Sequence, residues 1–495
     1  MIKNKKLSGS ITVFAALIFL AVFSLFITLI QSAYHSATKA RIDSALALAA
    51  ESAFAGYSNE VFNRYGIFVL SSSSDALART KEVLAANMAG SKAGLTGVSF
   101  TNEIRMTDNG GEPFYRQAVD YMKSEGVAAY VNDMLSDESK TAQNGGKIGD
   151  LAEKLGNSTN TGASEEKILE DINRIMGEEN AGDTSGVSSS VKRDLQNAAE
   201  KETGQGEVQR NEKSEKSFSD IKSLLSGDLT RLVLGENGRI SGKRMEVSGW
   251  EQNERLVKRD SLSGVNVNTV NDVLLREYIL MTFNNYTESA DTGDSGDKLD
   301  YGVEYIIGGK TSDKQNLDAV IRRIFLIREG MNFTYILTHG ELKEQAALFA
   351  AALFGWTLNP LIIKAAEYRV IALWAAGESV ADLRCLYGGG KVPLIKSPDT
   401  WNLSLEGLMK GRLNPSASER NKGFDYKGYL RIILLGDNSI QCARAMDLIE
   451  MRMMGLGFNN FRMRDCIFAM GVKGDFVLPF GRHIYAREYE YAYSK

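Results

Sequence analysis

An uninterrupted apolar run near the N-terminus constrains this chain more than any other feature. Residues 11–30 read ITVFAALIFLAVFSLFITLI and contain no charged side chain. Twenty helical residues at 1.5 Å each extend about 30 Å, which is the thickness of the hydrocarbon core of a bilayer. The polar side chains in the run are the hydroxyls of Thr12, Ser24 and Thr28, which can bond back to their own helix. The run therefore predicts a single transmembrane helix over residues 10–30.

The charges on either side of this run predict its orientation. Lys3, Lys5 and Lys6 precede it, and the first charges after it are Lys39 and Arg41. By the positive-inside rule, residues 1–9 form a cytoplasmic leader and the bulk of the chain is extracytoplasmic, anchored in the cell membrane. A cleaved secretory signal is the alternative. The run is longer than the usual apolar region of such a signal and lacks a clear Ala-x-Ala site.

Helical composition continues beyond the membrane run. Alanine dominates QSAYHSATKARIDSALALAAESAFAG, and neither Pro nor Gly occurs before Gly56. We therefore expect one pilin-like helix of about 45 residues that stops at Gly56; the alternative is two helices with a bend near Gln31. Small residues form a stripe suited to close helix packing, at Ala33, Ala37, Ala40, Ser44 and Ala47.

This N-terminal segment resembles type IV pilins and their Tad-type relatives. The resemblance rests on the lysine-bearing leader, Gly9–Ser10 and ITVFAALIFL, and on ATKARIDSALALAAESAFA, which is similar to the post-membrane segment of TadE/TadG-like proteins. It implies cleavage by a prepilin peptidase between Gly9 and Ser10. Phe14 stands where pilin-type sequences usually carry a glutamate. The resemblance therefore implies a minor or capping component, or an uncleaved anchor, rather than a repeating fibre subunit.

The composition of the remaining chain predicts three further regions. Residues 31–135 combine the extended helix with a membrane-proximal α+β region, in which we expect strands at 67–70 and 98–106. Residues 136–216 are rich in Gly, Ser, Asn, Lys and Glu and contain no aromatic residue, so they predict either a flexible tether or a polar helical stalk.

Residues 217–495 predict a helix-rich α+β domain. Helical spacing recurs at 265–286, 317–337 and 429–454, whereas strands are expected at 299–309, as a pair around Gly474 within 465–479, and at the chain end. The apolar stretch 345–382 is broken at Asn359–Pro360 and carries Lys364, Glu367 and Arg369. It therefore predicts two packed core helices, with a membrane hairpin as the alternative.

Several segments of the second half together resemble the bacterial family DUF5702. They are LDYGVEYIIGGKTSDKQNLDAVIRRIFLIREGMNF, GKVPLIKSPDTWNLSLEGL, FDYKGYLRIILLG and the RAMDLIE stretch. The resemblance implies a membrane setting and an association with Tad-type pilus components. It implies no activity.

Few residues stand in patterns that carry chemistry. The three cysteines form no Cys-x-x-Cys pair; they predict buried thiols, with a Cys442–Cys466 disulfide as the alternative. The three histidines are too dispersed for a metal site, and GGGK at 388–391 and GGKT at 308–311 lack the spacing of a P-loop. Neither a metal nor a cofactor is therefore expected. Tyr485, Tyr489, Tyr491 and Tyr493 alternate along the last strand and predict either its buried face or a binding face.

These observations favour a structural protein over an enzyme. A formal net charge of −4 and a pI near 5.8 make nucleic acid an unexpected partner. We expect a helix-rich α+β protein that acts as a minor pilin-like or pseudopilin-like component of a Tad-type pilus or secretion system. It would contact lipid through residues 11–30 and other pilus or assembly proteins through the Ala-rich helix 33–55. An anchored extracellular ectodomain that binds a ligand or acts as an enzyme is the alternative.

Overall fold

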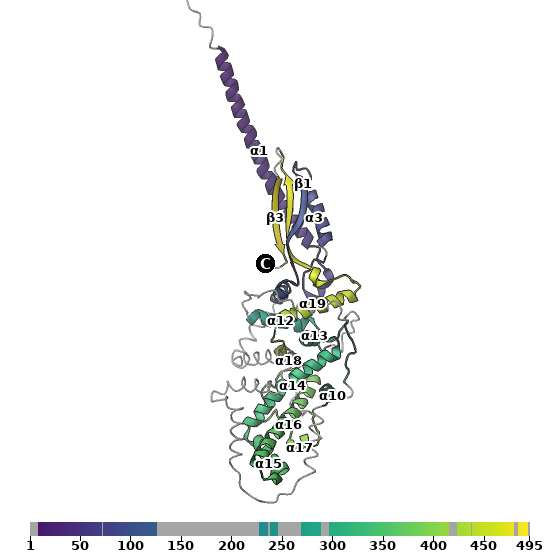
Figure 1. Ribbon diagram of the computed structural model, residues 1–495. Coiled ribbons are helices and arrows are strands. Elements are labelled where there is room, and N and C mark those ends of the chain that lie inside the picture. Colours follow the sequence, from purple (N-terminus) through teal and green to yellow (C-terminus); the bar gives the residue numbers. More distant parts are fainter. Residues whose placement is uncertain are drawn as a thin grey trace, which may run out of the picture. The chain divides into compact units, whose positions relative to one another are not determined.

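The chain folds into two compact units. Unit 1 comprises Met1–Gln117 and Asn460–Lys495, and unit 2 comprises Ala118–Asn459. Sequence alone placed 217–495 in one domain, whereas the structure assigns residues from Asn460 onward to the unit that contains the N-terminal helix. The computed structural model (Figure 1) describes residues 8–71, 73–125, 227–235, 238–245, 269–288, 297–414, 423–436, 438–479 and 484–493. The polar region 136–216 lies outside these residues.

One continuous helix, α1 (Ser8–Phe54), begins unit 1 and confirms the expected extended helix. It runs without a bend past Gln31 and appears in Figure 1 as a long purple rod. Residues 11–30 are exposed on all sides of the helix. Among the described helices, α1 is the one that is long and apolar enough to cross a membrane, with a mean hydropathy of 2.9 over its most apolar window. This is compatible with a single-pass membrane anchor.

A three-stranded antiparallel sheet forms the other half of unit 1. Its strands are β1 (Gly94–Arg105), β2 (Ile467–Val477) and β3 (Ile484–Ala492), in the order β1-β2-β3. The register places Val472 between Phe100 on β1 and Tyr489 on β3. The predicted strands at 98–106 and at the chain end are thereby confirmed. The central strand comes from a distant part of the sequence, since Arg105 pairs with Ile467.

Two predictions about strands in unit 1 are wrong. Residues 465–479 contain one strand rather than a pair, because Gly474 lies inside the ladder, paired with Val98 and Arg487. A Cβ at Gly474 would lie 2.7 Å from the Phe476 ring, so this glycine permits close packing and makes no turn. Residues 67–70 form an isolated bridge between Leu70 and Ile467 instead of a strand.

The core of unit 1 lies where the second half of α1 meets the sheet and α3 (Ser73–Met88). Ile42, Leu46, Ala50 and Phe54 are buried there, and the alanines of this face let the backbones approach closely. The tyrosines of β3 pack half-buried against the same core, so they form the buried face of an edge strand. The unit also contains α2 (Asn59–Tyr65), which is capped by Gly66, and the 3₁₀ turns η1 (Asp108–Gly110) and η3 (Met463–Asp465).

Arg41 ties α1 to the end of α3. Its Nε and Nη2 donate to the carbonyl of Asn87 at 3.1 and 3.0 Å, and Nη2 also donates to that of Ala89 at 2.8 Å. Cations commonly bond the last carbonyls of a helix in this way. The arginine that carries part of the resemblance to TadE/TadG-like segments thus has a structural role here.

Unit 2 is built mainly from helices. The chain enters it within α4 (Glu112–Ser124), and α14 and α15 both pack along α16. The bounds of the others are α10 (Leu229–Leu234), α12 (Thr269–Thr282), α13 (Gly302–Gly308), α14 (Asp313–Thr338), α15 (Gly340–Phe354), η2 (Gly355–Thr357), α16 (Pro360–Tyr387), α17 (Leu405–Met409), α18 (Tyr426–Ile433) and α19 (Asn438–Gly455).

The long core helices of unit 2 confirm the prediction of α-helix at 317–337 and of two helices within 345–382. Asn359 caps α16 by accepting hydrogen bonds from the amides of Leu361 and Ile362, and Pro360 occupies the first turn. The expected strand at 299–309 is wrong, because Gly302–Gly308 form the helix α13. All six residues from Gly302 to Ile307 are buried, so the segment carries no amphipathic period that sequence could reveal.

Candidate functional site

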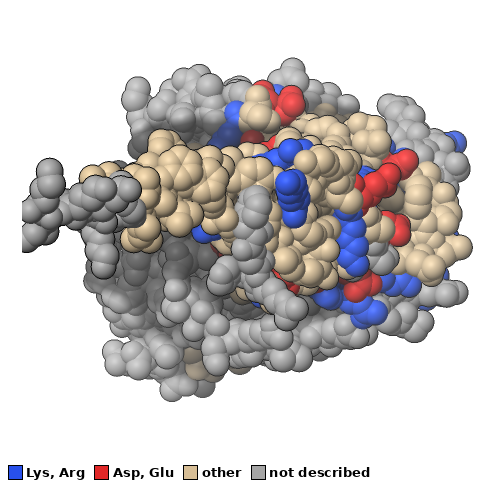
Figure 2. Space-filling view, turned by 90° about the horizontal axis from the view of Figure 1, so that it is seen from above, with Lys and Arg blue, Asp and Glu red and all other residues tan. Residues whose placement is uncertain are grey.

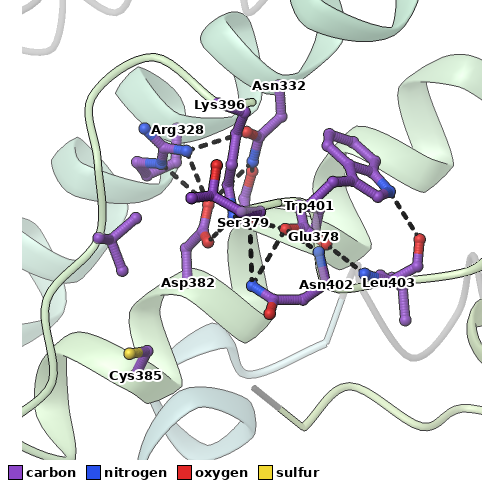
Figure 3. Close-up of polar contacts among 12 residues, drawn as sticks. Arg328, Asn332, Glu378, Ser379, Asp382, Cys385, Lys396, Trp401, Asn402 and Leu403 are labelled. Atoms are coloured by element: carbon purple, nitrogen blue, oxygen red, sulfur yellow. Dashed lines mark hydrogen bonds and ion pairs between the residues drawn. The ribbon is translucent and has the colours of Figure 1, made fainter. Parts of the chain in front are cut away.

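A cluster of four charged side chains is buried inside unit 2 (Figure 3). Arg328 comes from α14, Glu378 and Asp382 from α16, and Lys396 from the loop after α16. The side chains of Arg328, Glu378 and Asp382 are fully buried, and that of Lys396 is 1% exposed. Residues four positions apart share one helix face, so Glu378 and Asp382 both reach the same loop.

Asp382 lies between the two cations. Its Oδ2 accepts from Arg328 Nε at 2.9 Å, and its Oδ1 accepts from Lys396 Nζ at 2.7 Å. The Arg328 guanidinium continues to the loop, where Nη1 donates to the carbonyls of Pro393 at 2.9 Å and Leu394 at 2.6 Å. One arginine therefore joins α14 to α16 and to the loop.

Glu378 fixes the far end of the same loop. Its Oε1 accepts from Lys396 Nζ at 2.6 Å and from the amide of Asn402 at 3.0 Å, while Oε2 accepts from the amide of Leu403 at 2.8 Å. The carbonyl of Leu403 in turn accepts from the indole nitrogens of Trp374 and Trp401, at 2.8 and 2.7 Å. Hydrogen bonds to the backbone of Asn402 and Leu403 therefore fix this end of the loop.

Burial and charge act against each other on the pKa values of the two acids. Burial raises the pKa of Glu378, and the positive charge of Lys396 opposes this. Burial also tends to raise the pKa of Asp382, but Arg328 and Lys396 together outweigh it, and the pKa of Asp382 is lowered. Asp382 is therefore the carboxylate most firmly held in its ionised form.

The donor count defines what this cluster can do chemically. Lys396 has three N–H donors, and Glu378, Asp382 and the Thr400 carbonyl accept from them. Arg328 has five, and Asp382, Asn332, Pro393 and Leu394 engage all its nitrogens. No donor is left to polarise a substrate or transfer a proton to it. The arrangement is better suited to holding α14, α16 and the following loop together than to catalysis. We call its four side chains, Arg328, Glu378, Asp382 and Lys396, the clasp.

The residues singled out from the sequence do not meet in one site. Cys385, Cys442 and Cys466 are buried and form no disulfide in the described structure, so the alternative of a Cys442–Cys466 disulfide is not realised. Cys442 lies on α19 in unit 2, whereas Cys466 lies in unit 1, and each is enclosed by the core of its own unit. In the part of the chain that the structure describes, no three His, Cys, Asp or Glu side chains are grouped as metal ligands require.

The remaining motifs have local roles. Gly308–Gly309 ends α13, and Gly388–Gly389 ends α16, where Gly389 has a φ of +79°. Gly9 and Ser10 lie in the first turn of α1. The clasp itself was missed by sequence reasoning. Its signal was the pair Glu378 and Asp382, two acids on one face of α16 directly after the uncharged run 370–377.

Comparisons with known proteins identify the family. Neither the curated proteins nor the solved structures include a match to this chain. A model of a family of unknown function, DUF5702, matches residues 207–477, which is more than half of the 495 residues. The match covers the complete clasp and β2 but not α1. This chain therefore belongs to the DUF5702 family.

Proposed function

We propose that this protein is a membrane-anchored structural or assembly component, of the minor-pilin type, in a Tad-type pilus or secretion system. Its N-terminus would be cytoplasmic and both folded units extracytoplasmic. The observation that carries this proposal is that the first part and the second part of α1 have different surroundings. The helix is apolar and exposed over residues 11–30, and the same helix then supplies the core of unit 1 from Ile42 to Phe54.

The exposed surface of α1 supports lipid contact along its first part. Figure 2 shows this part of the helix, at the left, as a surface without Lys, Arg, Asp or Glu. Ser24 and Thr28 satisfy their hydroxyls on the carbonyls of Ala21 and Ser24, at 2.8 Å each, so the helix presents no unpaired side-chain donor at those two positions. The lysines before residue 11 and their absence until Lys39 support a cytoplasmic N-terminus.

The small-residue stripe supports an assembly role for the second part. One face of α1, which includes Ile42 and Leu46, packs into the core of unit 1. Ala33, Ala37 and Ala40 lie exposed on the described surface, as does Ser44. A face of small residues next to a membrane span is suited to close packing against a second helix. The second part of α1 would therefore pack against the sheet of unit 1 with one face and against another pilus subunit with its exposed face.

The N-terminal mass of the full chain, purified from its own membranes, tests the pilin-type reading. Processing would give a chain that starts at Ser10, with or without methylation, and a Gly9→Val variant would keep its leader. An intact N-terminus in the unmodified chain would contradict pilin-type processing. The helix would then be an anchor alone.

Site-directed cross-linking tests the docking face. An Ala37→Cys variant should form a disulfide or maleimide link to a neighbouring pilus component in intact cells. Lys81→Cys, on the exposed surface of α3, is the matched control and should form none. The native thiols are buried and contribute little background. Equal linking at both positions would refute a specific face on α1.

A further inference from the structure

Two arginines from different helices converge on one backbone oxygen in unit 2. Arg323, on α14, donates from Nη1 to the carbonyl of Ile307 at 3.1 Å. Arg444, on α19, donates from Nη1 to the same oxygen at 2.8 Å and to the carbonyl of Ile306 at 2.7 Å. The two Nη1 atoms therefore lie within about 6 Å of each other. Two positive charges are thus held together at the end of α13.

No carboxylate forms an ion pair with either arginine within the described part of the chain. Neither guanidinium has an ion pair within 4.0 Å, whereas the neighbouring Arg322 pairs with Asp318 at 2.9 Å. Burial and the charge of Arg444 lower the pKa of Arg323 to about 10. Burial also lowers the pKa of Arg444, although Tyr305 and Asp447 oppose the change. No acidic group opposes the lowered pKa of Arg323, whereas Asp447 opposes that of Arg444 without forming an ion pair with it.

Capping of α13 accounts for part of this arrangement. The carbonyl end of a helix carries roughly half a negative charge, so one arginine would more than balance it. The second arginine leaves an excess of more than one positive charge. Gly309 accommodates it, because a Cβ there would lie 2.3 Å from Arg444 Nη2. The Arg444 guanidinium thus lies directly against the backbone of the turn.

Unused donors define the ligand. Each guanidinium has five N–H donors, and the hydrogen bonds described above use Nη1 alone. Nε and Nη2 of both side chains therefore donate no hydrogen bond in the described structure, and those of Arg444 pack against Gly309. The Nε and Nη2 edge of a guanidinium binds two oxygens of an oxyanion. A carboxylate fills one edge, whereas a phosphate group has enough oxygens for two. Both side chains remain partly exposed, so a ligand can reach them.

We propose that Arg323 and Arg444 form a binding site for a phosphate group, taken either as free inorganic phosphate or as the headgroup of a lipid. The site lies on the family-matched part of the chain and is independent of how α1 is processed. Ligand bound to the folded state alone raises its stability, so thermal unfolding reports the binding.

The test compares inorganic phosphate with chloride at equal ionic strength, on the full chain in an uncharged detergent. Phosphate at millimolar concentration should raise the unfolding temperature by a few degrees. Arg322→Gln removes the same charge from the same helix turn and should respond as the unmodified chain does. Arg323→Gln and Arg444→Gln should bind about tenfold more weakly or not at all, since each loses a charged fork. Equal responses to phosphate and chloride would show that the arginines only cap α13.

Two further arms complete the test. Micelles doped with phosphatidylglycerol, compared with phosphatidylcholine, report a lipid headgroup as the source; a response to inorganic phosphate alone assigns the free ion. If a glutamine variant fails to fold, Arg323→Lys keeps the charge and a donor to Ile307 but loses the fork. It should weaken the phosphate response about tenfold. A lysine variant that binds like the unmodified chain would overturn the two-fork geometry.

Discussion

Arg487 on β3 donates from Nε to Asp43 Oδ1 on α1 across 2.9 Å, although 444 residues separate the two in the sequence. Next to this pair, Lys39 lies 5.2 Å from the centre of the Tyr485 ring. Unit 1 is therefore closed by contacts between its first and last elements. The contacts at the surface and those in the core should contribute very differently to its stability.

Truncation of Phe54 should destabilise unit 1 far more than removal of the surface ion pair. Phe54 is 2% exposed and its ring packs against Tyr491 and Tyr493, at centroid distances of 4.7 and 4.8 Å. Phe54→Ala should cost about 3–5 kcal/mol, whereas Arg487→Ala should cost less than about 1 kcal/mol because both partners are exposed. Pulse proteolysis in increasing urea measures both, and similar midpoints for the two variants would contradict this account.

Asp382→Asn should destabilise unit 2 strongly. The change leaves two buried cations, Arg328 and Lys396, with half of their negative partner charge removed, and we expect a loss of about 3–5 kcal/mol. Asp318→Asn is the matched control, because its partner Arg322 is largely exposed, and it should cost less than about 1 kcal/mol. Fluorescence of Trp374 and Trp401, which both bond to Leu403 beside the clasp, follows unfolding. A small effect of Asp382→Asn would refute the clasp.

Glu304 should make unit 2 less stable as the pH rises. Burial, with a smaller contribution from Asp313, raises the pKa of Glu304 to about 7, against the bonds from Tyr286 and Tyr426. One of its oxygens, Oε2, has no hydrogen-bond partner in the described part of the chain. Below about pH 4.5 the group is protonated in both states. Between about 4.5 and 7 the unfolded chain releases the proton first, so stability falls through this window and then levels off.

Glu304→Gln isolates this effect from those of other acids. The amide keeps an acceptor for the Tyr286 amide and the Tyr426 hydroxyl, which now bond Oε1 at 2.8 and 2.7 Å. Unfolding temperatures at pH 5 and pH 8 should differ less for the variant than for the unmodified chain, by the equivalent of up to about 3 kcal/mol. Parallel pH profiles would mean that Glu304 has an ordinary pKa.

Gly309→Ala should destabilise the end of α13. Its φ of +63° is strained for alanine, and the new Cβ would displace the Arg444 guanidinium, so we expect a loss of about 1–3 kcal/mol. Gly355→Ala is the control: its φ of −60° is helical and nothing lies within 4 Å of the added Cβ. That change should be neutral or slightly stabilising. Equal effects of the two substitutions, read by tryptophan fluorescence in urea, would contradict the close approach of Arg444.

Sequence predicted best the elements whose composition allows one structure. The charge-free run and the alanines after it specify α1, and Asn359–Pro360 specifies the boundary between α15 and α16. Sequence failed where tertiary contacts decide. Val303, Tyr305 and Ile307 alternate as in a strand, but burial on all sides makes a helix equally compatible with that pattern. Gly474 was taken as a turn because the ring of Phe476, which requires the glycine, becomes a neighbour only in the folded sheet.

The clasp could have been suspected but not constructed from the sequence. Glu378 and Asp382, at a four-residue spacing after the uncharged run 370–377, indicate buried partners. Nothing in the pattern says that Arg328, 54 positions from Asp382, is one of them. The convergence of Arg323 and Arg444 is even harder to predict from the sequence, because it depends on which backbone carbonyl lies at the end of α13.

The position of β2 has a consequence for biosynthesis. This strand joins β1 to β3, and it enters the chain after all of unit 2. The three-stranded sheet against which α1 buries its second half cannot be complete until synthesis has passed residue 492. A polypeptide interrupted anywhere before that point would carry an anchor with Ile42, Leu46 and Phe54 incompletely covered. The topology therefore makes folding of unit 1 depend on synthesis of the chain through β3.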